Sequence, residues 1–384
     1  DGEVRLTYWP VKQPDQTQTT SWVSVDPEKD FTHQFEIKGL SPGSEYRLVS
    51  EARNATGKTG SKVEGSFRTA PNSTTPANVA FSVITGQEYH RRDDPDNGHK
   101  IYPRMQELGV DFFVHTGDII YYDKPAPFAD NIQLGRFKWN RMYGLPFQRD
   151  FHNQTSSYFI KDDHDTLKND CWPEQTYGNL TWDQGLVLFC EQVPMGDRPY
   201  RTFRWGQDLQ VWLVEGRDYR SPNRMPDGPE KTIWGDQQKK WLFNSIQQSD
   251  ASFRIVISPT PIVGPDRGNK NDNHANAGFT HEGDEVRKFL SQQKNTYVIC
   301  GDRHWQYVSV DEQTGLKEFS CGSASDEHAS GWKDGNRLPE HTYLKVQGGF
   351  LSIEVKREAG KPVLIATHHE VTGKPSNIDR NLAD

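Results

Sequence analysis

Residues 112–122 read Phe112-Phe113-Val114-His115-Thr116-Gly117-Asp118-Ile119-Ile120-Tyr121-Tyr122. The apolar start of this stretch predicts a buried strand, and the glycine lets the backbone turn sharply where the strand ends. Asp118 and Tyr121 follow the turn, so a carboxylate and a phenol can reach one hard cation at the carboxyl edge of a sheet. A Gly-Asp pair after apolar residues is also common in ordinary turns, so the rest of the chain decides its meaning.

The stretch lies in a pattern that alternates strands and helices. Residues 79–85 read as a strand, 100–108 as a helix and 110–115 as the next strand, which makes a βαβ unit. The pattern predicts an α/β domain with two packed sheets and terminal β-strands that cover one edge. Further predicted strands are 158–160, 209–214, 253–257, 296–300 and 349–355, and further helices are 234–246 and 284–290.

The first 76 residues follow another pattern. Alternating apolar residues at 4–9 and a second apolar stretch at 31–37 predict a small all-β sandwich domain. A turn segment resembles the Leu-x-Pro-x-Thr-x-Tyr corner of fibronectin type III modules, which implies a structural role for its tyrosine. The matching residues are Leu40, Pro42, Ser44 and Tyr46. We therefore expect a partial fibronectin type III-like domain at 1–76 and a catalytic domain at 77–384.

Composition excludes several classes of protein. The 384 residues carry a formal net charge of -8, and 26% of them are charged, which describes a soluble protein without nucleic-acid specificity. No apolar run approaches the roughly 20 residues that span a bilayer, so we expect no transmembrane segment. Four cysteines are too few for a disulfide framework. The chain begins at Asp1 without an initiator Met, which suggests a processed protein.

Polar clusters follow three further predicted strands. Because strand ends of an α/β sheet meet at one edge, we expect these clusters to converge with Asp118 and Tyr121 on one pocket. Carboxylates, a phenolate and imidazoles suit one or two ions of Fe, Ca, Mn or Zn. The clusters are Asp162-Asp163-His164-Asp165, Arg217-Asp218-Tyr219-Arg220 and Gly301-Asp302-Arg303-His304.

In this order the motifs resemble those of the calcineurin-like metallophosphoesterases, and within them the alkaline phosphatase D (PhoD-like) type. Residues 117–121 resemble its Gly-Asp-x-x-Tyr block, 162–165 its Asp-Asp-His-Glu block and 301–304 its closing Gly-Asp-x-His block. The resemblance implies a two-sheet metallophosphoesterase (αββα) sandwich, behind the small β-domain. It also implies a hydrolase that uses metal-activated water, in a secreted or periplasmic protein.

The resemblance assigns metal ligands residue by residue. Asp118 would bridge two metals, Tyr121 and His304 would bind the first, and Asp163 the second. Asp302 is either a further ligand or a structural turn residue.

The same resemblance assigns the catalytic and substrate-binding residues. It makes His164 a catalytic residue that protonates the leaving group or stabilises the transition state, and Arg217 the residue that holds a substrate oxyanion. The remaining substrate-binding candidates are Arg303, His90 and Gln87.

The chain also departs from the family pattern. Gly86 stands where the resemblance places a cysteine ligand, so Glu88, His90 or Asp93 replaces that ligand, or the site holds a single or different metal. We expect His115 to be a hydrogen-bonded core histidine. Three histidines in loop-like stretches are expected to face solvent: His274, His281 and His328.

Three functions remain open. The first is a metal-dependent phosphoric ester hydrolase that acts on a mono- or diester of a small molecule. The second is a carbohydrate-active enzyme on the same fold, a sugar sulfatase or polysaccharide lyase that acts on an oligosaccharide. The missing metal ligand at Gly86 and the 11 tryptophans favour this alternative. The third is a non-catalytic binding protein. Phosphate and sulfate are both tetrahedral oxyanions, so an arginine such as Arg217 does not distinguish them.

Overall fold

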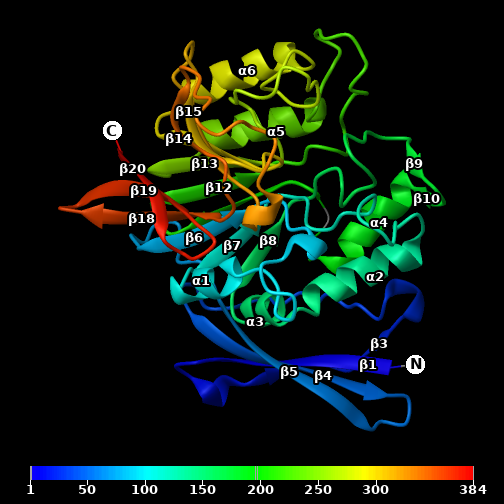
Figure 1. Ribbon diagram of the computed structural model, residues 1–384. Helices are drawn as coiled ribbons and strands as arrows, with labels where there is room; N and C mark the ends of the chain where they lie inside the picture. The colour runs from blue at the N-terminus through cyan, green and yellow to red at the C-terminus, as the bar shows by residue number, and fades with distance from the viewer. Residues whose placement is uncertain (1, 195, 197, 384) are drawn as a thin grey trace.

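The computed structural model describes residues 2–194, 196 and 198–383. Two β-sheets stack face to face, and helices cover the outer face of each sheet (Figure 1). This is the predicted two-sheet αββα arrangement. A smaller strand-rich region, formed by the N-terminal residues, lies against one side of it.

The first sheet has six strands in the order β20-β19-β18-β6-β7-β8. β6, β7 and β8 run parallel, so their carboxyl ends meet at one edge, and the functional site forms there. The terminal strands β18 to β20 extend the other side of this sheet, as the sequence predicts. The bounds are β6 Val79–Ile84, β7 Phe112–His115, β8 Ser156–Phe159, β18 Phe350–Glu358, β19 Lys361–His369 and β20 Pro375–Leu382.

The second sheet has seven strands in the order β11-β12-β13-β14-β16-β15-β17. β12, β13, β14 and β16 run parallel and the other strands pair antiparallel. A single bridge between Thr85 and Ser323 joins the two sheets at the edge that carries the site. The bounds are β11 Arg201–Trp205, β12 Leu209–Leu213, β13 Phe253–Ser258, β14 Thr296–Cys300, β15 Gln306–Val310, β16 Lys317–Cys321 and β17 His341–Lys345.

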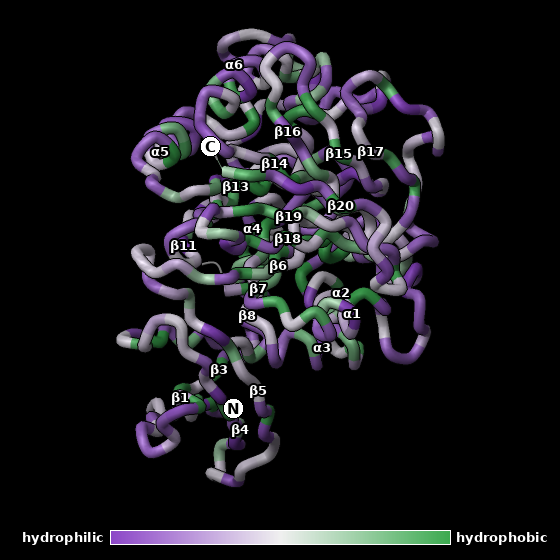
Figure 2. The backbone as a smooth tube through the Cα atoms, turned by 90° about the vertical axis from the view of Figure 1, so that its left-hand side faces the viewer, coloured by the Kyte–Doolittle hydropathy of each residue, from purple (hydrophilic) through white to green (hydrophobic). Residues whose placement is uncertain are grey.

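Three apolar cores hold these layers together. One lies between the two sheets, one beneath α1 to α4, and one beneath α5 and α6. Figure 2 shows the hydrophobic stretches concentrated among the stacked strands at the centre. The bounds are α1 Ile101–Glu107, α2 Ile132–Tyr143, α3 Pro146–His152, α4 Trp182–Gln192, α5 Gly235–Gln247 and α6 Thr280–Ser291, with short elements η1 Pro14–Gln16, η2 Pro27–Lys29, η3 Tyr89–Arg91, η4 Asp326–His328, β9 Thr176–Tyr177 and β10 Leu180–Thr181.

The N-terminal strands pair into one sheet, with bounds β1 Gly2–Pro10, β2 Gln18–Thr19, β3 Val23–Val25, β4 Glu45–Asn54 and β5 Thr59–Arg68. The hydroxyl of Tyr46 accepts a hydrogen bond from the backbone N–H of Ser41 at 2.9 Å, which fits the structural role expected of this tyrosine. The expectation of a strand at 31–37 was wrong. Asp30 and Phe31 both have positive φ, which breaks an extended path, and the irregular segment packs onto the sheet instead. The fibronectin type III resemblance stays a prediction.

Polar contacts attach the N-terminal sheet to the two-sheet region. The N–H of Ser66 donates to the carbonyl of Asn153 at 2.7 Å, and Arg68 pairs with Asp111 at 2.6 Å. β5 ends at Arg68 and β6 begins at Val79, so the predicted boundary near residue 76 falls in the connection. Within the described residues, every helix is too short or too polar to cross a membrane.

Candidate active site

The chain turns sharply after β7, and this turn places Asp118 at the sheet edge. Gly117 has φ +103°, and a Cβ added there would lie 2.5 Å from the Cβ of Asp162. A glycine is therefore required for the turn to pass the loop that follows β8. Asp118 itself has φ 55° and is 1% exposed. The backbone thus holds this carboxylate in one place.

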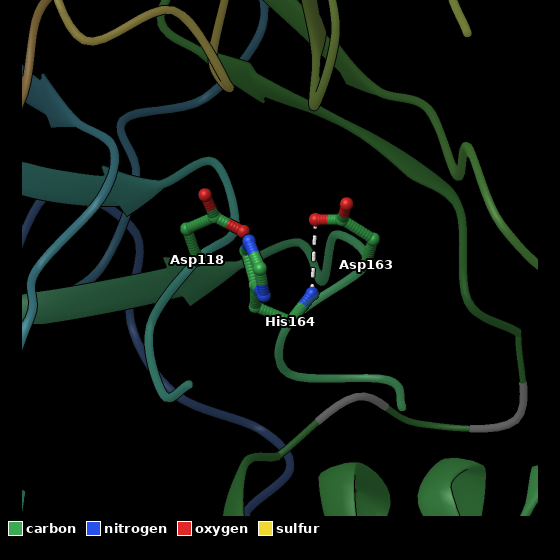
Figure 3. Close-up of side chains that lie close together, drawn as sticks. All are labelled: Asp118, Asp163 and His164. Atoms are coloured by element: carbon green, nitrogen blue, oxygen red, sulfur yellow. Dashed lines mark hydrogen bonds between the residues drawn. The ribbon is translucent and has the colours of Figure 1, made fainter. Parts of the chain in front are cut away.

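Asp118 forms a cluster with Asp163 and His164, which come from the loop after β8 (Figure 3). One ligand atom from each of the three lies within 4.8 Å of the others. The Oδ1 atom of Asp118 is buried and has no hydrogen-bond partner among the described residues. A buried carboxylate oxygen without a partner is costly unless a cation satisfies it, so this donor set fits a metal ion.

Tyr121 and His304 face the same carboxylate. The hydroxyl of Tyr121 donates to Oδ2 of Asp118 at 3.0 Å, and Nε2 of His304 lies 3.6 Å from the same oxygen. The structure therefore brings together Asp118, Tyr121, Asp163 and His304, four of the five residues that the sequence predicts as metal ligands. Asp302 lines the same cavity, with its carboxylate paired to Arg303 at 2.6 Å.

The sequence reasoning missed Asp123, which holds His164. Nδ1 of His164 lies 2.6 Å from Oδ1 of Asp123, and the N–H of Asn169 donates to the other oxygen of that carboxylate at 2.9 Å. Burial disfavours the charged imidazole of His164 and lowers its pKa. The carboxylates of Asp163, Asp118 and Asp123 have a larger effect in the opposite direction, so the pKa is raised to about 9. Asp123 lies two residues after Tyr121, directly beyond the stretch 112–122, and this closeness was the available signal.

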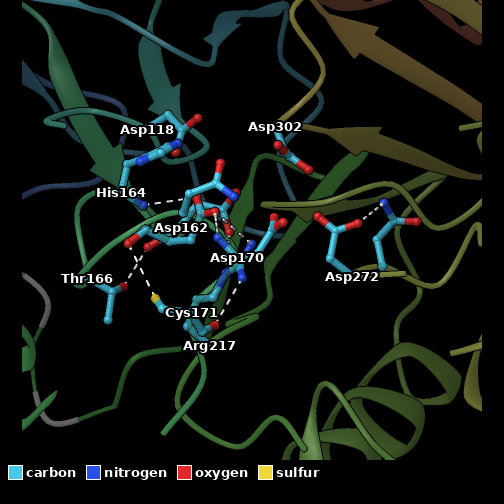
Figure 4. A network of polar contacts seen from close by, with 12 residues as sticks. Asp118, Asp162, His164, Thr166, Asp170, Cys171, Arg217, Asp272 and Asp302 are labelled. Atoms are coloured by element: carbon cyan, nitrogen blue, oxygen red, sulfur yellow. Dashed lines mark hydrogen bonds and ion pairs between the residues drawn. The ribbon is translucent and has the colours of Figure 1, made fainter. Parts of the chain in front are cut away.

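Arg217 lies behind the cluster in a buried polar network (Figure 4). Its Nε donates to Oδ1 of Asp162 at 2.6 Å and its Nη1 to the carbonyl of Cys171 at 3.2 Å. Nη2 lies 3.9 Å from Oδ2 of Asp163. The side chain is 0% exposed and is not among the residues that line the cavity, so its predicted contact with substrate stays a prediction. In this position the guanidinium orients the aspartates.

A cavity of about 330 Å³ opens over the cluster. Four cationic side chains line it, Arg91, Lys124, Arg267 and Lys270. The guanidinium of Arg267 also lies over the ring of Trp305, 5.5 Å from its centroid. A small cavity with positive side chains around a buried carboxylate cluster suits a compact anionic ligand.

Residues 81–359 of the chain match the sequence profile of the PhoD-like phosphatases. The chain belongs to the PhoD-like phosphatase family. Alkaline phosphatase D of Bacillus subtilis strain 168 is 23% identical over 357 residues. That alignment covers 77% of this chain and 58% of the relative, so the chain spans less than two thirds of that protein's length.

Two solved structures share the fold of this PhoD-like chain. A structure of PhoD superposes with a TM-score of 0.77 at 17% identity and covers 99% of this chain and 82% of the other. The purple acid phosphatase PPD1 from yellow lupin (Lupinus luteus) seeds superposes with a TM-score of 0.71 at 12% identity, covering 99% and 69%. These matches confirm the two-sheet metallophosphoesterase fold.

Three other substrate-binding candidates of the PhoD-like chain lie away from the cavity wall. Arg303 is buried and pairs with Asp266 at 2.6 Å. The side chain of Gln87 is buried and accepts a hydrogen bond from Tyr102, and His90 is exposed on η3. Their contact with a substrate therefore stays a prediction.

Two loop histidines were expected to face solvent, and this was wrong. His274 is 0% exposed and bonds Glu282 at 2.9 Å, because its loop folds back onto α6. His328 is 2% exposed and lines the cavity, because η4 lies against the end of β6. His281 is exposed, as expected.

His115 is a core residue, as expected, but its predicted hydrogen bond is absent. Neither ring nitrogen has a partner among the described residues. Burial holds its pKa well below the usual value, so the ring stays neutral.

Proposed function

We propose that this chain hydrolyses phosphoric esters of small molecules with the help of one or two bound metal ions. The observation that carries the proposal is the buried Asp118, Asp163 and His164 cluster, whose ligand atoms lie within 4.8 Å. Membership of the PhoD-like phosphatase family supports the same chemistry. Asp118, Tyr121, Asp163 and His304 would hold the metal, and the metal identity is open among Fe, Ca, Mn and Zn.

The side chains around the metal-binding cluster would have different roles in the reaction. When bound, a metal ion would act as a Lewis acid and lower the pKa of a coordinated water to about 7. His164 lines the cavity and is held by Asp123, so it can donate a proton to the oxygen of the leaving group. Arg217 fixes Asp162 beside Asp163, and thereby supports a carboxylate that would hold the metal.

The cavity favours a compact anionic ester. Its volume of about 330 Å³ is close to the lower limit of small-molecule sites and leaves little room for a polymer. The cationic side chains of Arg91, Lys124, Arg267 and Lys270 attract a negative group. The predicted secreted or periplasmic location and the lack of nucleic-acid specificity stay predictions.

A panel of chromogenic esters tests the proposal. Wild type and Asp118→Asn would be assayed on p-nitrophenyl phosphate, bis(p-nitrophenyl) phosphate and p-nitrophenyl sulfate, with bound metal measured in the same samples. We expect wild type to hydrolyse a phosphate ester, and Asp118→Asn to lose metal and about 10²-fold or more of the rate. Asp96→Asn, an exposed aspartate, is the control. Unchanged hydrolysis and metal content in Asp118→Asn would contradict the proposal.

A sugar sulfatase or polysaccharide lyase is the second candidate. Gly86, which offers no metal-binding side chain, keeps this candidate open. Trp305 on the cavity wall is 1% exposed and stacks on Trp332, with ring centroids 5.4 Å apart, so its ring offers a sugar little free surface. Incubation with sulfated and uronic-acid polysaccharides, with sulfate release and unsaturated product scored separately, distinguishes these reactions. A non-catalytic binding protein is disfavoured because the predicted ligands converge. Metal analysis that finds an empty site would support it.

A further inference from the structure

His328 lies on the cavity wall, and its ring is held in one orientation. Its Nδ1 lies 3.0 Å from the carbonyl oxygen of Gly86, which is 242 residues away in the sequence. A carbonyl only accepts hydrogen bonds, so Nδ1 carries the proton and Nε2 presents a lone pair. Nε2 lies 3.4 Å from the hydroxyl of Tyr121 and 3.8 Å from Oε2 of Glu88. The imidazole thus points an acceptor atom into the predicted metal site.

Several hydrogen-bond acceptors lie around the hydroxyl of Tyr121. Few of the neighbouring groups carry a proton that could form a hydrogen bond between these acceptors. That hydroxyl has one proton, which is given to Asp118 at 3.0 Å. Nε2 of His304 also lies 3.4 Å from the hydroxyl, and the two imidazole rings are 4.0 Å apart between centroids. Lone pairs of Asp118, Glu88 and His328 therefore lie close together beside the ring of His304. A cation is the simplest way to satisfy them together.

Gly86 provides the space that the two rings occupy. Its φ is +57°, and a Cβ there would lie 2.9 Å from Nε2 of His304 and 3.5 Å from Cε1 of His328. The N–H of Ala324 donates to the same Gly86 carbonyl at 3.1 Å, so the loop before η4 is fixed to the end of β6. Position 86 offers no side chain to the site, and the imidazole of His328 on η4 lies beside it.

We propose that His328 is a metal ligand through Nε2, in place of a side chain at position 86, with Glu88 as a neighbouring carboxylate. This rests on the proposed metal-dependent function. The resulting set has two imidazoles, a phenol and carboxylates. Nitrogen donors in this number favour transition metals such as Fe, Mn or Zn over Ca²⁺, which prefers an all-oxygen site. Nδ1 bound to a backbone carbonyl is also the usual outer contact of a metal-binding histidine.

Metal binding measured without catalysis tests the ligand. Metal-free protein would be titrated with Mn²⁺, Zn²⁺, Co²⁺ and Ca²⁺ for wild type, His328→Ala and the volume-conserving His328→Gln. We expect both variants to bind the transition metals at least about tenfold more weakly. His368→Ala is the matched control, because His368 is equally buried and bonds the Ser320 carbonyl outside the site. It is expected to keep the wild-type affinity.

A spectroscopic measurement separates a ligand from a structural residue. In cobalt-loaded wild type, the Nδ1 proton of His328 is expected to give a hyperfine-shifted resonance that is lost in His328→Gln and retained in His368→Ala. Wild-type metal affinity and an unchanged spectrum in His328→Gln would overturn the proposal. If His328→Gln gave that result and the wild type hydrolysed phosphate esters, only the ligand proposal would be overturned and the proposed function would be retained. Metal binding that depends on His328, without hydrolysis of any phosphate ester, would overturn only the function.

Discussion

Asp123 has a role that can be separated from metal binding. Its carboxylate holds Nδ1 of His164 at 2.6 Å and stabilises the charged imidazole. Asp123→Asn removes that charge but keeps the size of the side chain. We expect kcat on a small phosphate ester to fall about 10- to 100-fold, with KM and bound metal nearly unchanged, because the variant loses part of the roughly 10²- to 10⁴-fold that proton donation by a positioned histidine contributes.

Steady-state kinetics and metal analysis on the same preparation check this expectation. Asp96→Asn again serves as the control, because its side chain is exposed. A loss of metal as large as the loss of kcat would show that Asp123 supports the cluster instead of the acid.

At the residue scale, short sequence motifs were sufficient to predict the site residues whose positions depend on the chain segment around them. Asp118 and Tyr121 share one turn, and Asp163 and His304 follow strand ends, so sheet topology brings them together. His328 could not be predicted this way. Its role depends on a contact with Gly86 across 242 residues, and nothing in its own neighbourhood marks it as different from the exposed His281.

At the element scale, α4 supports the loop that carries His164. A Cβ added to Gly185 in this helix would lie 1.9 Å from the carbonyl oxygen of Thr166. The hydroxyl of Thr166 in turn bonds the carbonyl of Asp162 at 2.5 Å. We expect Gly185→Ala to push the loop away, to lower the free energy of unfolding by about 1–3 kcal/mol and to reduce kcat.

Urea unfolding and kinetics measure both effects of Gly185→Ala. Val187→Ala changes an exposed residue, 59% exposed, on the same helix and should match wild type. If Gly185→Ala were as stable and active as Val187→Ala, the helix would not determine the position of the loop.

Periodicity predicted some elements and missed others for a physical reason. The strands of the parallel sheet and α5 have regular apolar patterns, and the predicted ranges overlap them closely. In α2, the buried face includes Lys138, whose ammonium bonds the carbonyl of Pro125 at 3.0 Å and also contacts that of Tyr121. A buried lysine breaks the apolar period, although here it ties the helix to the loop after Tyr121.

At the scale of the whole molecule, the alternation of strands and helices was sufficient to predict two stacked sheets with helices outside. The attachment of the N-terminal sheet was not predictable. It depends on contacts such as Ser66 with Asn153 and Arg68 with Asp111, which join backbone groups and an ion pair without an apolar signal. Polar docking of this kind leaves no periodic pattern in either segment.

Buried neutral histidines predict how the stability of the whole molecule depends on pH. Burial lowers the pKa of His99 and His152 to about 3 and that of His368 to about 4. The unfolded chain has histidine pKa values near 6.5, so below that pH it takes up protons that the folded protein excludes. The contribution of these three histidines to stability is therefore full above about pH 6.5 and falls as the pH drops toward 4. Each histidine contributes up to about 1.4 kcal/mol per pH unit.

Urea unfolding at about pH 7 and about pH 5 measures this slope. Replacing one such ring, as in His152→Gln, is expected to remove up to about 2 kcal/mol of the loss between those two values, because glutamine does not titrate. The amide can still bond the hydroxyl of Ser157, which His152 contacts at 2.8 Å. His281→Gln, at an exposed position, should follow the wild type. An equal slope in wild type and His152→Gln would mean that His152 takes up its proton within the folded protein, which the packing of its half-buried ring against Phe113 and Phe151 argues against.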